Sequence, residues 1–191
     1  GKSCRTVKPE NAEEAQMAKE LYLLTNKPVM YICNVDEASA KDGNQYVEQV
    51  REAVKDEEAD ILVIAAKIES DISELESYEE RQMFLEEMGL EESGVVRLIQ
   101  HAYSLLNLRT YFTVGVEECR AWTIKKGTKA PQAAGKIHSD FERGFIRAEV
   151  VNYKDLLELG SLSAAKGKGL VGIEGKEYVV KDGDVMLFLF N

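Results

Sequence analysis

The sequence predicts a chain of two fold classes in succession, an α/β part followed by an α+β part. Two apolar runs, 29–33 and 61–66, lie on either side of a helical pattern, which is typical of a βαβ unit with parallel strands. The charge then changes along the chain. Residues 1–106 carry 11 Lys and Arg against 23 Asp and Glu, a net of −12, whereas residues 107–191 carry 13 against 11, a net of +2. This shift predicts two units that meet near Leu106.

The composition is that of a soluble globular protein. Of 191 residues, 45% are hydrophobic and 30% are charged. We find no apolar run near the ~20 residues that cross a bilayer and no signal-peptide core, so no membrane partner is expected. Three cysteines (Cys4, Cys33 and Cys119) are too few and too scattered for a disulfide framework or a zinc site. We expect Cys33 and Cys119 in the core, no metal site, and a reducing, cytoplasmic location.

The first part reads as alternating helices and strands. Asn11 followed by Glu14 is typical of a helix N-terminus. The predicted elements, in order, are a helix over 12–25, a strand over 29–33, a helix over 44–55 and a strand over 61–66. The unbroken apolar run at 29–33 predicts a strand buried on both faces.

Residues 67–106 are predicted to be acidic and helical. Ser77 and Glu80 have capping-box spacing, and Gly89 suits the end of that helix. A second helix is predicted over 95–106. The Glu-rich surface is interpreted as a solvated helix face, not as a metal site.

The second part alternates strands with one main helix. The predicted elements are strands over 111–114 and 119–124, a helix from Pro131 to Gly144, a strand over 145–151, a short helix over 156–159, a Gly/Ser/Lys loop over 160–169, and strands over 178–180 and 185–190. Two strands, a helix and three more strands form the β-grasp, or ubiquitin-like, arrangement. A unit of this size can hold its own core.

The polar residues after the first buried strand are candidates for ligand binding. Asn34 to Glu37 follow the run 29–33 directly. Ligands of parallel sheets bind beyond the carboxyl ends of the strands, where this segment would lie. The same local pattern is also typical of an ordinary strand followed by a polar loop.

Longer motifs resemble one known family, the Obg-like ATPases or YchF family. Asn34-Val35-Asp36-Glu37 is similar to the altered base-reading motif of that family. Its C-terminal TGS domain is similar to five segments of this chain: Thr110–Val116, Arg120–Ile124, Ala130–His138, Asp140–Ala148 and Lys181–Met186. The resemblance covers essentially the whole chain.

The resemblance implies a division into four segments. Residues 1–26 would be the end of a helical, coiled-coil insertion, and 27–85 the C-terminal part of a P-loop-type G domain. Residues 86–106 would be a linking helix, and 107–190 a TGS domain. Family members are about twice as long and begin with a P-loop and magnesium-binding switches, so this chain resembles a C-terminal half.

The resemblance also implies a purine site. Asn34 would bond the purine edge, Val35 would lie against the base, Glu37 would orient the loop, and Ala66 would contribute its backbone N–H. The Lys and Asp of the guanine-reading motif Asn-Lys-x-Asp are replaced by Val35 and Glu37. The family's preference is for ATP over GTP, with Mg²⁺ in the intact protein. We expect no catalytic residue and no ATPase activity in this chain alone.

Two further expectations concern partners. By resemblance, the TGS-like part would contact RNA or the ribosome through exposed basic side chains, at Lys125, Lys126, Lys129, Lys136, Arg143 and Arg147. Two parallel strands alone leave sheet edges unpaired, so a missing N-terminal half or a dimer is expected to cover residues 27–66. The alternative is a stand-alone RNA- or protein-binding module without NTPase activity.

Overall fold

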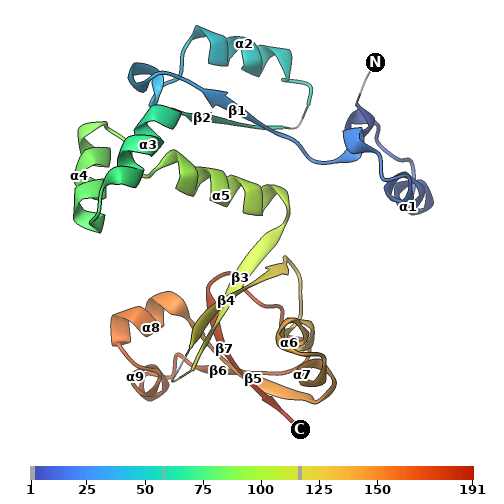
Figure 1. Cartoon of the computed structure of the whole chain (residues 1–191). Coiled ribbons are helices and arrows are strands. Elements are labelled where there is room, and N and C mark those ends of the chain that lie inside the picture. The colour runs from blue at the N-terminus through green and yellow to red at the C-terminus, as the bar shows by residue number, and fades with distance from the viewer. Residues whose placement is uncertain (1–2, 58, 116–117) are drawn as a thin grey trace. The chain divides into compact units, whose positions relative to one another are not determined.

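The structure is a computed structural model that describes residues 3–57, 59–115 and 118–191. It separates the chain into two compact units, 1–105 and 106–191, each of which is described by itself (Figure 1). Residues 1–2, 58 and 116–117 lie outside this description. The predicted segments 1–26, 27–85, 107–190 and Thr110–Val116 are therefore described except at those positions.

The N-terminal unit contains a two-stranded sheet and a series of helices. In chain order they are η1 (Cys4–Thr6), α1 (Ala12–Glu20), η2 (Leu24–Asn26), β1 (Met30–Asn34), η3 (Glu37–Ser39), α2 (Gln45–Ala53), β2 (Asp60–Ile64), α3 (Ala66–Glu74), α4 (Tyr78–Glu87) and α5 (Gly94–Leu105). Strands β1 and β2 pair in parallel, from Met30 with Asp60 to Asn34 with Ile64. The predicted βαβ unit is therefore confirmed.

The strand β1 is less buried than its sequence predicts. Ile32 is 51% exposed, whereas Leu62, its partner on β2, is 3% exposed. The reason is that, within the described residues, β1 pairs only with β2 and lacks a neighbour on its other edge. Its apolar run therefore predicts a larger sheet than the one this chain forms.

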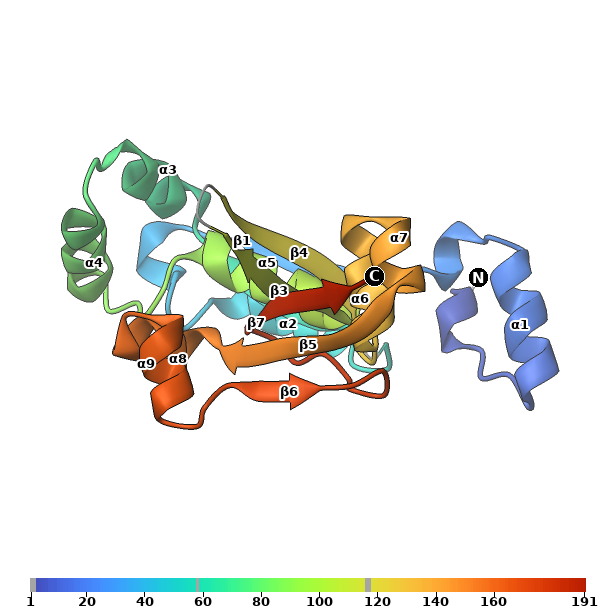
Figure 2. The ribbon, with the colours of Figure 1, turned by 90° about the horizontal axis from the view of Figure 1, so that it is seen from below.

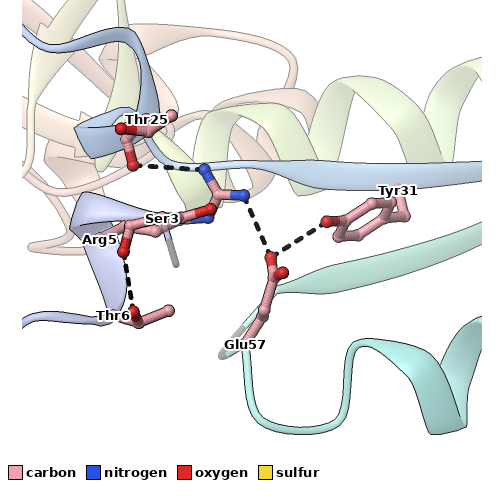
Figure 3. A network of polar contacts seen from close by, with 6 residues as sticks. All are labelled: Ser3, Arg5, Thr6, Thr25, Tyr31 and Glu57. Carbon is pink, nitrogen blue, oxygen red and sulfur yellow. Dashed lines mark hydrogen bonds and ion pairs between the residues drawn. The ribbon is translucent and has the colours of Figure 1, made fainter. Parts of the chain in front are cut away.

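The segment before β1 is attached to the sheet by one arginine. The Arg5 guanidinium donates to Glu57 Oε2 at 3.1 Å and to the Thr25 carbonyl at 3.4 Å, and the Tyr31 hydroxyl also donates to Glu57 Oε2, at 3.0 Å (Figure 3). These contacts hold the pKa of Glu57 below its usual value, with Arg5 as the main cause. The arginine thus joins both ends of the helical segment to Glu57, which precedes β2.

The C-terminal unit is a five-stranded mixed sheet with helices on both faces. Its elements are β3 (Leu108–Val114), β4 (Cys119–Lys125), α6 (Ala130–Ile137), α7 (Ser139–Arg143), β5 (Phe145–Asn152), α8 (Tyr153–Leu159), α9 (Leu162–Gly167), β6 (Gly172–Glu174) and β7 (Asp184–Phe190). The strand order is β4-β3-β7-β5-β6. Only the β3–β7 contact is parallel; the other neighbours are antiparallel (Figure 2).

The two faces of this sheet have separate cores. Tyr111, Val150 and Met186 pack against α6 in the larger core, on what we call the α6 face. Their neighbours along the strands belong to a smaller core with Ala165 of α9, on what we call the α9 face. Because side chains alternate along a strand, consecutive residues serve opposite faces.

Four predictions for local structure were wrong. The helix over 12–25 ends at Glu20, and Tyr22 has a left-handed φ of 50°. The helix from Pro131 to Gly144 is two helices, because His138 is extended and its ring accepts the Asp140 N–H to begin α7. The loop over 160–169 contains α9, and Cys119 is exposed at the start of the edge strand β4.

The predicted strand over 178–180 is also wrong. Val179 forms an isolated bridge with Lys129, and the Ala130 N–H donates to the Tyr178 carbonyl at 2.9 Å. Tyr178 and Val180 alternate because both pack against the α6 core, not because they belong to a ladder. The strand that lies between β5 and β7 in the sequence is instead β6, whose three residues carry no strong strand pattern.

Alkaline pH is expected to destabilise the C-terminal unit. Burial raises the pKa of Tyr111 and Tyr178 well above 10.0, and the Asp184 carboxylate adds to the effect at Tyr178. The folded state keeps these protons while the unfolded chain loses them, so this stabilisation is complete below about pH 10 and is lost above it. Each tyrosine should reduce the free energy of unfolding by up to about 1.4 kcal/mol per pH unit.

Urea unfolding at about pH 9, 10 and 11 measures this effect. Tyr178→Phe should reduce the slope of the free energy of unfolding against pH by about half. An unchanged slope in that variant would show that other groups cause the loss.

Candidate functional site

The candidate site lies where β1 and β2 end at the same edge of the parallel sheet. Asn34 and Ile64 are register partners and the last residues of their strands. The Val35 N–H donates to the Ile64 carbonyl at 2.9 Å, which continues the ladder by one residue. The loops that follow both strands therefore lie side by side.

A side-chain hydrogen bond joins these two loops. Asn34 Oδ1 accepts the backbone N–H of Ala66 at 3.0 Å. Ala66 is the first residue of α3, and Ala65 before it has no side chain that could cap the helix. Asn34 thus satisfies one of the free N–H groups at the start of α3. Because a backbone N–H can only donate, the amide oxygen must face Ala66 and Nδ2 remains available as a donor.

The other predicted residues of this edge have different environments. Val35 is half-buried and packs against the cluster of Ala65, Ile68 and neighbouring residues. Glu37 is exposed in the first turn of η3, which is capped by Asp36 Oδ1 accepting the Ser39 N–H at 2.9 Å. Glu37 therefore lies in a loop whose shape Asp36 stabilises.

Two charged residues of α3 follow directly. Lys67 forms an ion pair with Asp71, which raises the pKa of Lys67; Glu37 adds a weaker contribution. Glu69 is half-buried, and its carboxylate accepts the N–H groups of Gly94 at 2.7 Å and Val95 at 3.2 Å. The helix that begins at this edge is thus attached to the start of α5.

Glu69 is a residue that sequence reasoning missed. Its partners lie 25 and 26 residues away, so no local spacing indicates the contact. The sequence feature that could have indicated the contact is the glycine at position 94. Any other residue there would place its Cβ 2.9 Å from Glu69 Oε1 and 3.0 Å from Ile64. A glycine at a helix start is common enough that this signal is not specific.

The six predicted basic residues do not form one surface. Lys125 and Lys126 are exposed near the end of β4, and Lys129 precedes α6 and pairs with Glu177. Lys136 is exposed in the last turn of α6, and Arg143, at the end of α7, lies 3.8 Å from Asp140. These residues surround the helices of the α6 face.

Arg147 lies apart from the others. Its neighbour Ala148 belongs to the α6 core, so Arg147 is directed toward the opposite face, like Glu149, which pairs with Lys166 of α9 at 2.7 Å. Arg147 therefore lies on the α9 face, and the other five basic residues lie around the helices of the α6 face.

Neither the described residues nor their helices suggest a metal centre or a membrane anchor. In residues 3–57, 59–115 and 118–191, no three His, Cys, Asp or Glu side chains are grouped to hold a metal ion. Among the helices of these residues, none is long and apolar enough to cross a membrane.

Sequence comparisons relate this chain to longer proteins. A family model described as "YchF-GTPase_C: Protein of unknown function (DUF933)" matches residues 108–191. The "Ribosome-binding ATPase YchF" of Bacillus subtilis is 58% identical over 94% of this chain and 49% of its own length. That of Escherichia coli O157:H7 is 51% identical over 95% and 49%. "Obg-like ATPase 1" of Pongo abelii is 42% identical over 95% and 46%.

Solved structures show the same relation. The YchF GTPase of Schizosaccharomyces pombe matches 98% of this chain and 50% of its own, with a TM-score of 0.83 and 32% identity. A GTP-binding protein of Pyrococcus horikoshii matches 87% and 47%, with a TM-score of 0.59 and 19% identity, which shows likeness of fold alone. The chain therefore spans about half the length of the relatives that it matches.

Proposed function

Because this chain belongs to the YchF/Obg-like ATPase family and corresponds to the C-terminal half of its members, we propose that it supplies the purine-reading edge of a cytoplasmic, ribosome-associated ATPase. The observation that carries the proposal is the hydrogen bond from Ala66 N–H to Asn34 Oδ1. It holds the loops after two parallel strands together at the edge where such sheets bind ligands. ATP is the preferred substrate of this proposal, and GTP the weaker one.

The donor set at this edge fits a purine. With its oxygen bonded to Ala66, Asn34 presents Nδ2, a donor that suits the N7 acceptor shared by adenine and guanine. Val35 offers an apolar surface for the ring. Glu37 takes the place of the short aspartate that would read guanine. Ala66 N–H already donates to Asn34, so a contact from this N–H to the base requires exchange of that bond.

Preference for adenine would then come from a missing partner for guanine. A site that leaves the polar edge of a bound base unpaired loses several kcal/mol of affinity. The phosphate cradle and the Mg²⁺ ligands belong, in this proposal, to the N-terminal half of the longer protein. Bound MgATP supplies the phosphoryl group there, while the residues of this chain orient the base.

The C-terminal unit is proposed to be a TGS domain of the β-grasp type. Its sheet order, β4-β3-β7-β5-β6 with α6 packed across one face, supports this assignment. We propose that Lys125, Lys126 and Lys129, around the β4–α6 loop, contact ribosomal RNA. Lys136 and Arg143 extend this surface, and Arg147 lies outside it.

Nucleotide binding is expected to depend on Asn34 and on the rest of the protein. The 191-residue chain alone should show no ATP turnover above a protein-free blank, since phosphoryl transfer requires a phosphate cradle and a metal. In the chain joined to its N-terminal half, Asn34→Ala should weaken ATP binding at least about tenfold. Phosphate release measures ATP turnover, and isothermal titration measures ATP binding.

Asn26→Ala is a matched control, because Asn26 bonds the Ala18 carbonyl far from the edge. ATP turnover by the purified, contaminant-free chain alone that persists in Asn34→Ala would contradict the expected lack of activity. Unchanged ATP affinity in the joined Asn34→Ala variant would contradict the purine assignment.

Ribosome association is expected to depend on the β4–α6 loop. Changing Lys125, Lys126 and Lys129 to Glu should abolish co-sedimentation with ribosomes at low salt, and binding by the unchanged protein should weaken as salt rises. Lys154→Glu, Lys166→Glu and Lys168→Glu, on and beside α8 and α9, form a control with the same charge change. If the loop variant sediments like the control, this loop is not the interface.

The second candidate function is a binding module that acts without a nucleotide. The C-terminal unit supports it because it has its own core and is the part matched by the family model. A P-loop upstream in the same reading frame would favour the first proposal. We also propose that the N-terminal half, or a second copy, covers residues 27–66, where Ile32 is exposed on β1.

A further inference from the structure

Part of the α9 face of the C-terminal sheet is an exposed apolar surface. Helices α8 and α9 lie together at one end of the sheet (Figure 2), where they pack with Phe112, Val151 and Val185. Two residues further along β3 and β7, Val114 and Leu187 are 49% and 52% exposed. The two helices therefore cover one part of this face, and apolar side chains beside them are open to water.

The strand register extends this surface across the sheet. Leu187 is the register partner of Glu149 on β5, and Glu149 is the register partner of Ile173 on β6. Register partners lie on the same face, so Ile173, which is 65% exposed, is on the same side as Leu187. We call Val114, Leu187 and Ile173 the apolar row.

A groove leads from the apolar row toward the two helices. Its volume is about 390 Å³, and its lining includes Val114 and Leu187 of the row, Leu156 of α8 and Leu162 of α9. Concave apolar sites of this kind hold the anchoring side chains of protein interfaces. The groove is therefore suited to a large apolar side chain of a partner that lies on the row.

The charge beside the row favours an acidic partner. Arg147 is the register partner of Leu189, which follows Leu187 by two residues, so Arg147 lies on the same face as the row. Arg147 is exposed and forms no hydrogen bond or ion pair within the part of the chain that the structure describes. Glu149, in contrast, has its Oε2 2.7 Å from Lys166 Nζ. A carboxylate on the partner would thus complement Arg147.

A helix fits this surface better than other occupants. An added strand requires an unpaired sheet edge, whereas the row lies across the face of the sheet. Helices α8 and α9 already pack on the neighbouring part of this face, and a further helix would continue their layer. A bilayer surface has no protruding side chain that could enter the groove. A second copy would present the same surface, where Glu149 is already paired with Lys166 and is not free to meet Arg147.

We propose that the apolar row, the groove and Arg147 form a docking surface for an amphipathic helix of another protein. The helix packs its apolar stripe on the row, inserts one large apolar side chain between Leu156 and Leu162, and places a carboxylate at Arg147. This inference does not depend on the nucleotide site or on the RNA contacts proposed above, which involve other residues.

The test is a phage-displayed library of amphipathic helices on one fixed helical scaffold. The apolar positions of the library vary among Leu, Met, Phe and Trp, and the positions that flank the apolar stripe vary among Glu, Gln and Lys. Selection on the 191-residue chain, with counter-selection on Leu187→Lys, should enrich helices with Glu on one flank. The synthetic peptides should shift the amide resonances of Val114, Leu187 and Ile173.

Matched variants separate this surface from other exposed apolar residues. Ile173→Lys takes no part in the selection and should weaken binding of the selected peptides at least about tenfold. Val179→Lys, beside Lys129, is the control with the same kind of change and should leave binding unchanged within about twofold. Ile173 and Val179 are both exposed, so both variants should keep the fold, which Trp122 fluorescence in urea verifies.

An exchange of charges tests the role of Arg147. Arg147→Glu should weaken binding of the Glu-flanked peptides at least about tenfold, and replacing that Glu of the peptide with Lys should restore binding to this variant. Arg143→Glu is the control with the same change. Arg143 belongs to α7, whose Phe141 packs on the α6 face, so this variant should bind within about twofold of the unchanged chain.

Several outcomes would overturn the proposal. They are selection of no peptide above the counter-selected background, binding that Ile173→Lys leaves intact, a charge exchange that restores no binding, or resonance shifts confined to residues outside the surface. If vesicles of phosphatidylcholine and phosphatidylserine shift the apolar row and no peptide does, the surface binds membranes instead. Shifts at the row that depend on protein concentration alone would identify a second copy as the occupant.

Discussion

Replacing Asp184 with alanine is expected to destabilise the C-terminal unit by about 3–5 kcal/mol. Asp184 is 3% exposed, and its Oδ2 accepts the Tyr178 hydroxyl and the Lys181 N–H, both at 2.8 Å. Alanine removes two hydrogen bonds to a charged acceptor and leaves the half-buried Tyr178 hydroxyl and the Lys181 N–H without this partner. The carboxylate therefore holds the 178–184 loop against the core at the start of β7.

Urea unfolding monitored by fluorescence measures this loss. Trp122 is the only tryptophan of the sequence and lies in the same unit, so its emission reports on the correct part of the chain. Tyr178→Phe should cost about 1–2 kcal/mol, since one bond to Asp184 remains. Asp182→Ala is the exposed control; it loses one bond to the Thr110 N–H and should cost about 1 kcal/mol. Equal losses for Asp184→Ala and Asp182→Ala would contradict the importance of burial.

Replacing Glu69 with alanine is expected to destabilise the N-terminal unit by about 2–3 kcal/mol. The Glu69 carboxylate accepts the N–H groups of Gly94 and Val95 and places a negative charge at the start of α5. Alanine leaves both N–H groups without their partner, and Gly94 is itself buried. Glu69→Gln keeps one acceptor and should cost about 1 kcal/mol.

Amide hydrogen exchange locates this effect. The Gly94 and Val95 amides should exchange at least about tenfold faster in Glu69→Ala, while the Ala66 amide, bonded to Asn34, should be unchanged. Glu74→Ala, at the exposed end of the same helix, is the control. Faster exchange at Ala66 in Glu69→Ala would show that the two contacts at the start of α3 are coupled.

The sequence predicted the candidate edge for a physical reason. Each apolar run at 29–33 and 61–66 is long enough for a strand and too short for a helix, and a helix between them makes the strands parallel. Parallel strands end at the same edge, so Asn34 and Ala66 had to lie close together. The hydrogen bond between them was not predicted, because it depends on the exact positions of a side chain and a helix start.

Pairing between distant segments was predicted less well. The alternation of Tyr178 and Val180 indicates burial, and a strand is only one way to be buried. The short strand β6 has no strong pattern of its own, because its place is decided by pairing with β5. The basic residues were grouped by charge alone, and the alternation of β5 places Arg147 on a different face from the others.

The sequence by itself determined the periodic elements, the division into an acidic and a weakly basic part, and the motifs of the YchF/Obg-like ATPase family. These features depend on neighbours within about one turn or one strand. Only the tertiary structure decided the Asn34–Ala66 and Glu69–Gly94 contacts, the exposure of β1 and the parallel pairing of β3 with β7. Those features arise from contacts between residues far apart in the chain, whose geometry no local pattern records.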